Sequence, residues 1–298
     1  MSRPARWARR RPVGAVLALT ALALLLRLVA VGARTVHWDE ARVAYWTLRY
    51  VRGAGFAYRP IIHGPFVPIV AGALFERLGP TAFVARLPVA VIGGLAPLSA
   101  LLFRRPDGSS TADDDRARRP GIGLSNLETV ALAALLAVTP SLVYYSRFMR
   151  SDVPLGVFAL FALGFAVRAL ATGRRRHVVA AGLFAGLALT TKENALLYAA
   201  CAAGAAVVAV CWPAVVPLLP WREESDGRSA ATAALRGSLA RARALVARHL
   251  SAIPLALLAA LVPIVFFLAP RGAGGDPSLG AALAGEAGWL ALVERATL

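Results

Sequence analysis

Residues 250–270 read LSAIPLALLAALVPIVFFLAP and contain no charged side chain. A helix of about 18 or more apolar residues is long enough to cross the roughly 30 Å hydrocarbon core of a bilayer. Hydrophobic residues make up 58% of the 298-residue chain, and the mean hydropathy is +0.63, so this run is one of several. The composition argues against a soluble domain and predicts an all-α, polytopic transmembrane helix bundle.

About seven membrane-spanning helices are expected along the chain. Their predicted ranges are 13–33, 81–103, 126–146, 153–172, 178–191, 195–217 and 250–270. The fifth range is short, and its Gly182 and Gly186 form a small-xxx-small pattern that indicates close packing against another helix. We expect one transmembrane domain over 13–270 and an external segment, 271–298, that continues in a longer protein.

The formal net charge of +17 comes from basic clusters that lie between the apolar runs. Proteins that bind nucleic acid gather basic residues on one face, so this scatter argues against a nucleic-acid partner and favours contacts with membrane lipids. The larger share of the arginines, 19 of 32, falls in 1–12, 104–125, 174–176 and 218–249. The positive-inside rule therefore places these segments in the cytoplasm and the loop 34–80 outside a multi-pass protein of the cell membrane.

The external loop 34–80 is expected to contain two helices that lie in the membrane interface. Over 41–52, arginines and apolar or aromatic residues fall on different helical faces. The basic face has Arg42, Arg49 and Arg52, and the other has Val43, Trp46 and Tyr50. The apolar stretch 66–78 is too short to span a bilayer, which favours an interfacial or re-entrant helix.

The first polar cluster in the external segments is His37-Trp38-Asp39-Glu40. An acid at the start of a helix commonly caps it, and that role explains one carboxylate. It does not explain two acids among arginines and aromatics. A carboxylate in a cavity at the membrane surface can also bind a metal ion or accept a proton from an attacking hydroxyl. Both interpretations of this pair stay open.

The second cluster, residues 144–152, contains two tyrosines followed by Arg147, Arg150 and Asp152. Tyrosines at a helix end are typical of the membrane interface, where arginines also meet lipid headgroups. Asp152 opens an apolar span, where a carboxylate is costly unless it is paired, hydrated or bound. It can cap the helix and take part in a site at the same time.

The third cluster is Thr190-Thr191-Lys192-Glu193-Asn194, in the turn between the fifth and sixth spans. Lys192 is the single lysine of the chain. Lys192 and Glu193 can simply neutralise each other, or the ammonium can bind the phosphate of a lipid carrier. The acidic run Asp113-Asp114-Asp115 lies in a predicted cytoplasmic loop, across the membrane from these clusters, and we interpret it as solvated linker.

The order of these motifs resembles that of a known superfamily. The motifs are Asp39-Glu40, His63-Gly64-Pro65-Phe66, Arg86-Leu87-Pro88, Tyr144-Tyr145-Ser146-Arg147 followed by Asp152, and Thr191-Lys192-Glu193. Together they resemble the GT-C superfamily of polyprenyl-phosphate-dependent glycosyltransferases over most of residues 20–200. The motifs His-Trp-Asp-Glu-Ala and Thr-Lys-Glu-Asn are most similar to those of haloarchaeal flippase-associated proteins of archaeal N-glycosylation.

The resemblance implies transfer of a sugar from a dolichyl- or polyprenyl-phosphate donor on the external face. It implies Asp39 as the catalytic base, with Glu40 beside it, and His63 in the wall of the same cavity. The implied contacts with substrate or donor phosphate are Arg147, Arg150, Asp152, Lys192 and Glu193. Asp39 and Asp152 are the positions at which a divalent metal ion could be held. The acceptor is a glycan or a protein that the motifs do not define.

A second function remains open beside transfer. Members of the flippase-associated group can assist translocation of dolichyl-phosphate-linked sugars without catalysing transfer. Such a protein needs the phosphate contacts but no catalytic acid. A transporter is the weakest alternative, since it predicts inverted repeats or broken helices at the membrane midplane, and the sequence contains neither pattern.

Overall fold

The computed structural model describes residues 11–55, 64–105, 123–218, 227–271, 278–285, 288 and 290–291. Within these ranges the chain is helical and contains no β-strand, which confirms the all-α prediction for this part of the protein. His63 and the run Asp113-Asp114-Asp115 lie outside the described residues.

Among the described residues, four helical segments are long and apolar enough to cross a membrane, so the expected count of about seven is not confirmed. Two of them are the single helices α8 (Asp152–Thr172) and α10 (Asn194–Val215). The segment Ala82–Leu102 consists of α5 (Ala82–Leu95) and the 3-10 helix η2 (Ala96–Leu102). The segment Ser229–Leu268 includes most of α11 (Gly227–His249), then η5 (Leu250–Ala252) and α12 (Ile253–Leu268). Shorter apolar helices are α2 (Pro12–Leu28) and α6 (Asn126–Val138).

Two of the predicted spans, the third and the fifth, form helices shorter than a hydrocarbon core requires. The helix expected over 126–146 is broken at Thr139, and α7 (Pro140–Tyr145) begins at the proline that follows. A proline lacks the N–H that a continuous helix requires, which explains the break. The fifth range becomes α9 (Arg175–Leu189), whose 15 residues rise about 23 Å, less than the thickness of a hydrocarbon core.

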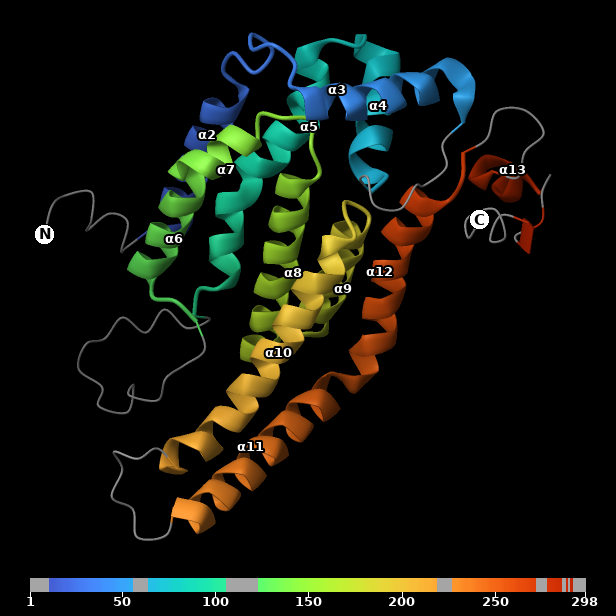
Figure 1. The fold of residues 1–298 in the computed structure, drawn as a ribbon. Helices are drawn as coiled ribbons and strands as arrows, with labels where there is room; N and C mark the ends of the chain where they lie inside the picture. Colours follow the sequence, from blue (N-terminus) through green and yellow to red (C-terminus); the bar gives the residue numbers. More distant parts are fainter. Residues whose placement is uncertain are drawn as a thin grey trace, which may run out of the picture.

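The two helices expected within the loop 34–80 are present as α3 (Trp38–Arg49) and α4 (Phe66–Leu78). In Figure 1, α3 lies across one end of the bundle, at a steep angle to α8 and α9. His37 caps α3 through two hydrogen bonds. Nδ1 of its ring accepts from the backbone N–H of Asp39, and its backbone N–H donates to the carboxylate of Glu40. Val43 of α3 is buried in the main hydrophobic core. The loop is therefore packed against the helix bundle and is more than a connection between two spans.

An aromatic contact connects α4 with the long helices. The ring of Phe66, the first residue of α4, lies 5.1 Å from that of Phe158 in α8 and 5.0 Å from that of Phe267 in α12. All three side chains are buried in the same core. Burial of aromatic surface of this size is a major stabilising contribution, so this contact fixes where the first loop meets the bundle.

The small-xxx-small pattern marks a close helix contact, as predicted. A Cβ atom added at Gly182 of α9 would lie 2.1 Å from the carbonyl oxygen of Ala256, and one at Gly186 would lie 2.2 Å from that of Ala260. Both carbonyls belong to α12. The missing side chains therefore let the backbones of α9 and α12 approach each other.

The segment 218–249, expected to be a loop, contains the helix α11 over residues 227–249. Its sequence is rich in alanine and arginine, which are among the best helix formers, so local propensity explains the difference. In Figure 1, α11 runs alongside α10, and both extend beyond the ends of α8 and α9. The segment predicted as a loop over 218–249 is therefore helical from residue 227 to residue 249.

The α9–α12 contact can be tested with one pair of alanine substitutions. Gly186→Ala places a methyl group against the backbone of α12 and should destabilise the protein by about 1–3 kcal/mol, as overpacking does. Gly204→Ala in α10 is the matched control, because nothing lies within 4 Å of the added atom. Thermal unfolding in detergent measures both. Equal unfolding temperatures for the two variants would contradict the contact.

Candidate active site

The site is organised around an ion pair between Glu40 and Arg86 that is almost completely buried. Glu40 is 2% exposed and Arg86 1%. Nε and Nη2 of Arg86 each donate a hydrogen bond of 2.8 Å, to Oε1 and Oε2 of Glu40 respectively. Oε2 also accepts from the His37 N–H at 3.0 Å, and Oε1 from the Met149 N–H at 2.9 Å. The carboxylate therefore joins α3, α5 and the turn that precedes α8.

Arg86 uses its other donors on the chain that leaves α2. Nη1 donates to the carbonyl oxygens of Val31 at 2.8 Å and Arg34 at 3.0 Å, and Nη2 donates to that of Thr35 at 3.1 Å. With the two bonds to Glu40, all five N–H groups of the guanidinium are used. A buried ion pair tolerates its desolvation when every polar atom is satisfied in this way.

Burial alone raises the pKa of the Glu40 carboxyl, because it disfavours the charged form. The hydrogen bonds from Arg86 and from the N–H groups of His37 and Met149 outweigh that effect, and the pKa lies below its ordinary value. Glu40 is therefore charged at neutral pH. Each of its oxygens already accepts two hydrogen bonds, which leaves little capacity for a substrate.

Asp39, the neighbour of Glu40, lies at one end of a row of alternating charges. Nη1 of Arg150 donates to Oδ2 of Asp39 at 2.7 Å. Nε of Arg150 lies 3.0 Å from Oδ2 of Asp152, an ion pair without the angle of a hydrogen bond. Nζ of Lys192 donates to Oδ1 of Asp152 at 2.8 Å. We call Asp39, Arg150, Asp152 and Lys192 the charged row.

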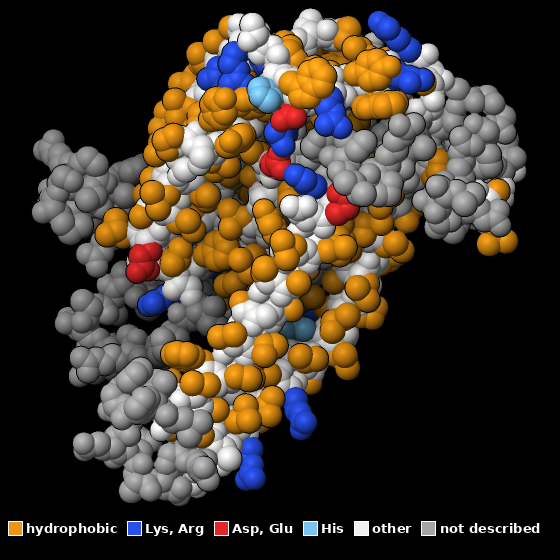
Figure 2. Space-filling model, viewed as in Figure 1, with side chains coloured by type: hydrophobic (Ala, Val, Ile, Leu, Met, Phe, Trp, Pro, Cys, Tyr) orange, Lys and Arg blue, Asp and Glu red, His pale blue; other side chains and the backbone are white. Residues whose placement is uncertain are grey.

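The charged row is accessible, unlike the Glu40–Arg86 pair. Its side chains range from 22% exposed for Lys192 to 41% for Asp152. Figure 2 shows acidic and basic side chains gathered near one end of the molecule, within a surface that is otherwise largely apolar. These ion pairs are therefore partly solvated and can be exchanged for contacts with a ligand.

Three separate turns bring the charged row together. Asp39 lies in the first turn of α3, Asp152 begins α8, and Lys192 lies between α9 and α10. The first loop is bound to the Lys192 turn through its backbone, since the N–H of Gly64 donates to Thr191 O at 2.8 Å. A Cβ at Gly64 would lie 2.2 Å from the carbonyl oxygen of Thr190, so this approach requires glycine.

Aromatic rings border the site next to Asp39. The guanidinium carbon of Arg34 lies 3.9 Å from the ring centroid of Phe148 and 5.1 Å from that of Tyr144. The His37 ring meets Phe148 edge-on, with 5.7 Å between centroids. The predicted tyrosine pair thus contributes Tyr144 to a cation–π contact.

Not every predicted site residue joins the charged row. The guanidinium of Arg147 donates to the carbonyl oxygens of Leu26 at 3.3 Å and Ala30 at 3.1 Å, where α2 ends. Glu193 is half-buried and directly precedes α10. The sequence reasoning gave no role to Arg34 or Arg86. An arginine at the start of an apolar helix was the signal that could have identified Arg86, because it must be paired there.

The donor set does not fit a divalent metal ion well. Among the described residues, no group of three or more His, Cys, Asp or Glu side chains could hold one. Arg150 lies between Asp39 and Asp152 and is paired with both. A cation bound by these two acids would have to displace a guanidinium.

The Glu40–Arg86 pair leads to a prediction about stability. We expect Glu40→Gln to destabilise the protein at pH 7 by about 3–5 kcal/mol, because it leaves the Arg86 charge buried without a partner. Asp39→Asn removes a partly exposed ion pair and should cost about 1 kcal/mol or less. Unfolding temperatures of the purified variants measure both effects.

The Glu40→Gln effect should also depend on pH. Because the folded pKa of Glu40 is lowered, its charge stabilises the fold above the ordinary value of 4.5 and loses that effect as the pH falls through the folded pKa. The unfolding temperatures of wild type and Glu40→Gln should therefore converge in acid. Curves that stay parallel from pH 7 down to about pH 3 would contradict this role.

Comparison with known proteins agrees with part of the resemblance found in the sequence. Residues 123–219 match the dolichyl-phosphate-mannose-protein mannosyltransferase family. Searches of curated proteins and of solved structures found no match. The matched range contains Arg150, Asp152 and Lys192 of the charged row, whereas Asp39 precedes it. Over residues 123–219 the chain is therefore similar to membrane glycosyltransferases of the GT-C type.

Proposed function

We propose that this chain is a membrane glycosyltransferase that moves a sugar from a dolichyl- or polyprenyl-phosphate donor to an acceptor on the external face. The observation that carries the proposal is the charged row of Asp39, Arg150, Asp152 and Lys192. It supplies an accessible carboxylate and two cations within one chain of contacts. The similarity to dolichyl-phosphate-mannose-protein mannosyltransferases supports the choice of donor.

In the proposed reaction, an acceptor hydroxyl or amide attacks the anomeric carbon of the donor sugar. The bond from this carbon to the phosphate oxygen breaks, and the lipid phosphate leaves with the electron pair. Asp39 accepts the proton of the attacking group as general base. Arg150 and Lys192 stabilise the negative charge that grows on the leaving phosphate. The reaction consumes no soluble nucleotide.

Asp152 is proposed to position both cations. Its two oxygens lie 3.0 Å from Nε of Arg150 and 2.8 Å from Nζ of Lys192. Arginine and lysine side chains lose considerable rotamer freedom when they are fixed, so a carboxylate that holds both reduces the cost of ordering them around a phosphate. The donor phosphate then competes with Asp39 and Asp152 for contacts that are already partly solvated.

The two adjacent acids differ in what they can do. Glu40 is buried and accepts four hydrogen bonds, from Arg86 and from two backbone N–H groups. Asp39 is about one-third exposed and binds one guanidinium nitrogen. A general base must reach the proton that it removes. We therefore assign the catalytic role to Asp39 and a positioning role to Glu40.

Two sequence motifs support a narrower proposal for the pathway in which the protein acts. His37-Trp38-Asp39-Glu40-Ala41 and Thr191-Lys192-Glu193-Asn194 favour glycoprotein or glycolipid assembly of the archaeal N-glycosylation type. The same motifs are compatible with an alternative function, a non-catalytic component that assists flipping of dolichyl-phosphate-linked sugars. The accessible acid favours transfer, since binding of a phosphate does not require a carboxylate beside the cations.

Asp39→Asn tests the catalytic role. The substitution keeps the size of the side chain but removes its charge, and should reduce sugar transfer by ~10²-fold or more, the scale of a lost general base. The assay is transfer of a radiolabelled sugar from a dolichyl-phosphate donor in membranes, normalised to protein abundance. The control replaces Asp113, Asp114 and Asp115 together with Asn, and should transfer like wild type.

The outcomes separate the alternatives. Wild-type transfer or glycan flipping by Asp39→Asn would remove the catalytic role and support the lipid-binding alternative. Loss of activity in the triple variant alone would show that the working face is the other side of the membrane.

A further inference from the structure

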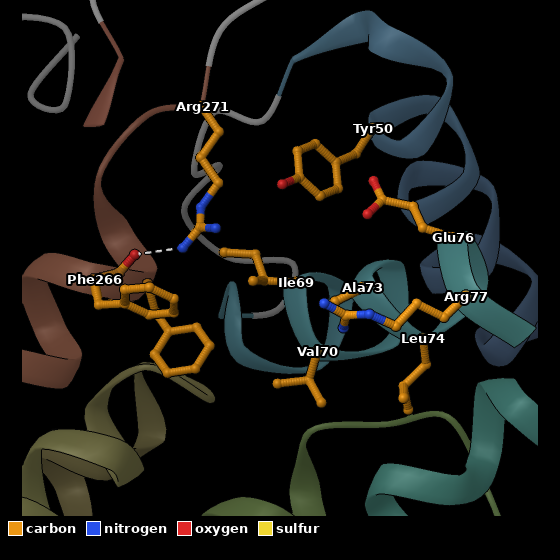
Figure 3. Close-up of a pocket in the computed structure, with 10 residues that line it drawn as sticks. Tyr50, Ile69, Val70, Ala73, Leu74, Glu76, Arg77, Phe266 and Arg271 are labelled. Carbon is orange, nitrogen blue, oxygen red and sulfur yellow. Dashed lines mark hydrogen bonds between the residues drawn. The ribbon is translucent and has the colours of Figure 1, made fainter. Parts of the chain in front are cut away.

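A cavity of about 440 Å³ lies between α4, the π-helical turn η1 (Tyr50–Ala54) and the end of α12 (Figure 3). Its volume is in the range of small-molecule sites. Val70 and Leu74 of α4 and Phe267 of α12 form apolar parts of its wall. None of its lining residues belongs to the charged row. It is therefore a separate feature of the first loop.

Two arginines line this cavity from different elements. Arg77 comes from the last turn of α4, and Arg271 follows α12. Nη2 of Arg271 donates to the carbonyl oxygen of Phe266 at 2.7 Å, whereas its Nε is buried and has no hydrogen-bond partner among the described residues. Within the described part of the chain, no carboxylate forms an ion pair with either arginine. Both guanidiniums therefore retain capacity for an anion.

The charge of the lining also restricts the ligand. Figure 3 shows the hydroxyl of Tyr50 directed toward Arg271, and the carboxylate of Glu76 next to Tyr50. Glu76 offsets one of the two arginines, so the lining carries one net positive charge. This charge matches a phosphodiester, which has one negative charge, better than a phosphomonoester, which approaches two near neutral pH.

The position of the cavity indicates where such a ligand comes from. The candidate span Ser229–Leu268 ends between Phe267 and Arg271. Apolar walls at the end of a span, next to arginines just beyond it, correspond to the level at which lipid chains meet their headgroups. An amphiphile can place its chain against Val70 and Leu74 and its head between the two guanidiniums.

We propose that this cavity is a second lipid site, which binds the phosphodiester head of an amphiphile between Arg77 and Arg271. The phosphodiester can belong to a bilayer phospholipid or to a dolichyl-phosphate-linked sugar, since both have this head and an apolar chain. The site is distinct from the charged row, and the inference does not depend on the proposed transfer reaction.

The test introduces the photo-crosslinking residue p-benzoylphenylalanine at Val70 of the full chain in maltoside detergent micelles, which supply no phosphodiester of their own. Separate samples contain added phosphatidylglycerol, a dolichyl-phosphate-linked sugar or diacylglycerol, and mass spectrometry identifies the adduct. We expect adducts with one or both phosphodiester lipids and little with diacylglycerol. Inorganic phosphate should not compete, because it has no chain to occupy the apolar wall. Which lipid is captured distinguishes the two sources.

The arginine variants decide the role of the charges. Arg77→Gln with Arg271→Gln should reduce the phosphodiester adduct about tenfold or more, the effect of losing at least one charge-assisted hydrogen bond. Arg52→Gln, an exposed arginine of the same loop, is the matched control and should not change it. Lys192→Gln alters the charged row and should leave the Val70 adduct intact, whether or not it affects transfer.

Equal adducts with diacylglycerol, or an unchanged adduct in the double arginine variant, would overturn the proposal. Native mass spectrometry of chains without the crosslinker provides a second measurement that does not depend on the substitution at Val70. There the double arginine variant should retain fewer phosphodiester lipids than the Arg52→Gln control. Identical lipid retention would also contradict the site.

Discussion

The rest of this structure depends on a buried carboxylate–guanidinium pair. Removing Glu40 and Arg86 from water costs several kcal/mol for each ion, and this cost is tolerated only when both are paired and fully hydrogen-bonded. Among the described residues, the partners that complete the pair are backbone groups of the chain leaving α2, of the cap of α3 and of Met149. Burial of the pair therefore holds α3 across the bundle and fixes the turn before α8. As a result Asp39 lies next to Arg150, just as Glu40 lies next to Met149.

A second buried arginine, Arg27, also joins separate elements, at the break between α6 and α7. Arg27 of α2 is fully buried, and it donates to the carbonyl oxygens of Leu136 at 3.1 Å and Ala137 at 2.9 Å. Pro140 has no N–H, so the helix break at Thr139 leaves the carbonyl of Leu136 without its usual helical partner. Arg27 also donates to the Ser146 hydroxyl at 3.2 Å. In both places an arginine satisfies backbone carbonyls at a helix end or in the chain that follows one, and thereby positions the turn that carries Arg150 and Asp152.

The sequence predicted the elements whose signals are local. Periodicity and length predicted helices near α3 and α4, and the spacing of Gly182 and Gly186 predicted a close helix contact. The tertiary partners could not be predicted in the same way. The adjacent acids Asp39 and Glu40 look equivalent in the sequence, and only the packing of α5 shows that one is saturated. Arg147 and Arg150 were both expected at a phosphate, but the orientation of their turn sends Arg147 to α2.

Donor affinity is the most direct measure of what the charged row does, because the row is assigned to the phosphate of the donor. Lys192→Gln removes one of its two cations at a partly exposed pair, so the fold should stay within about 1 kcal/mol of wild type. With purified protein, we expect the KM for the dolichyl-phosphate sugar to rise about tenfold or more, as for one lost charge-assisted contact. A KM and kcat equal to those of wild type would contradict it, because the lysine would then have no contact with the donor.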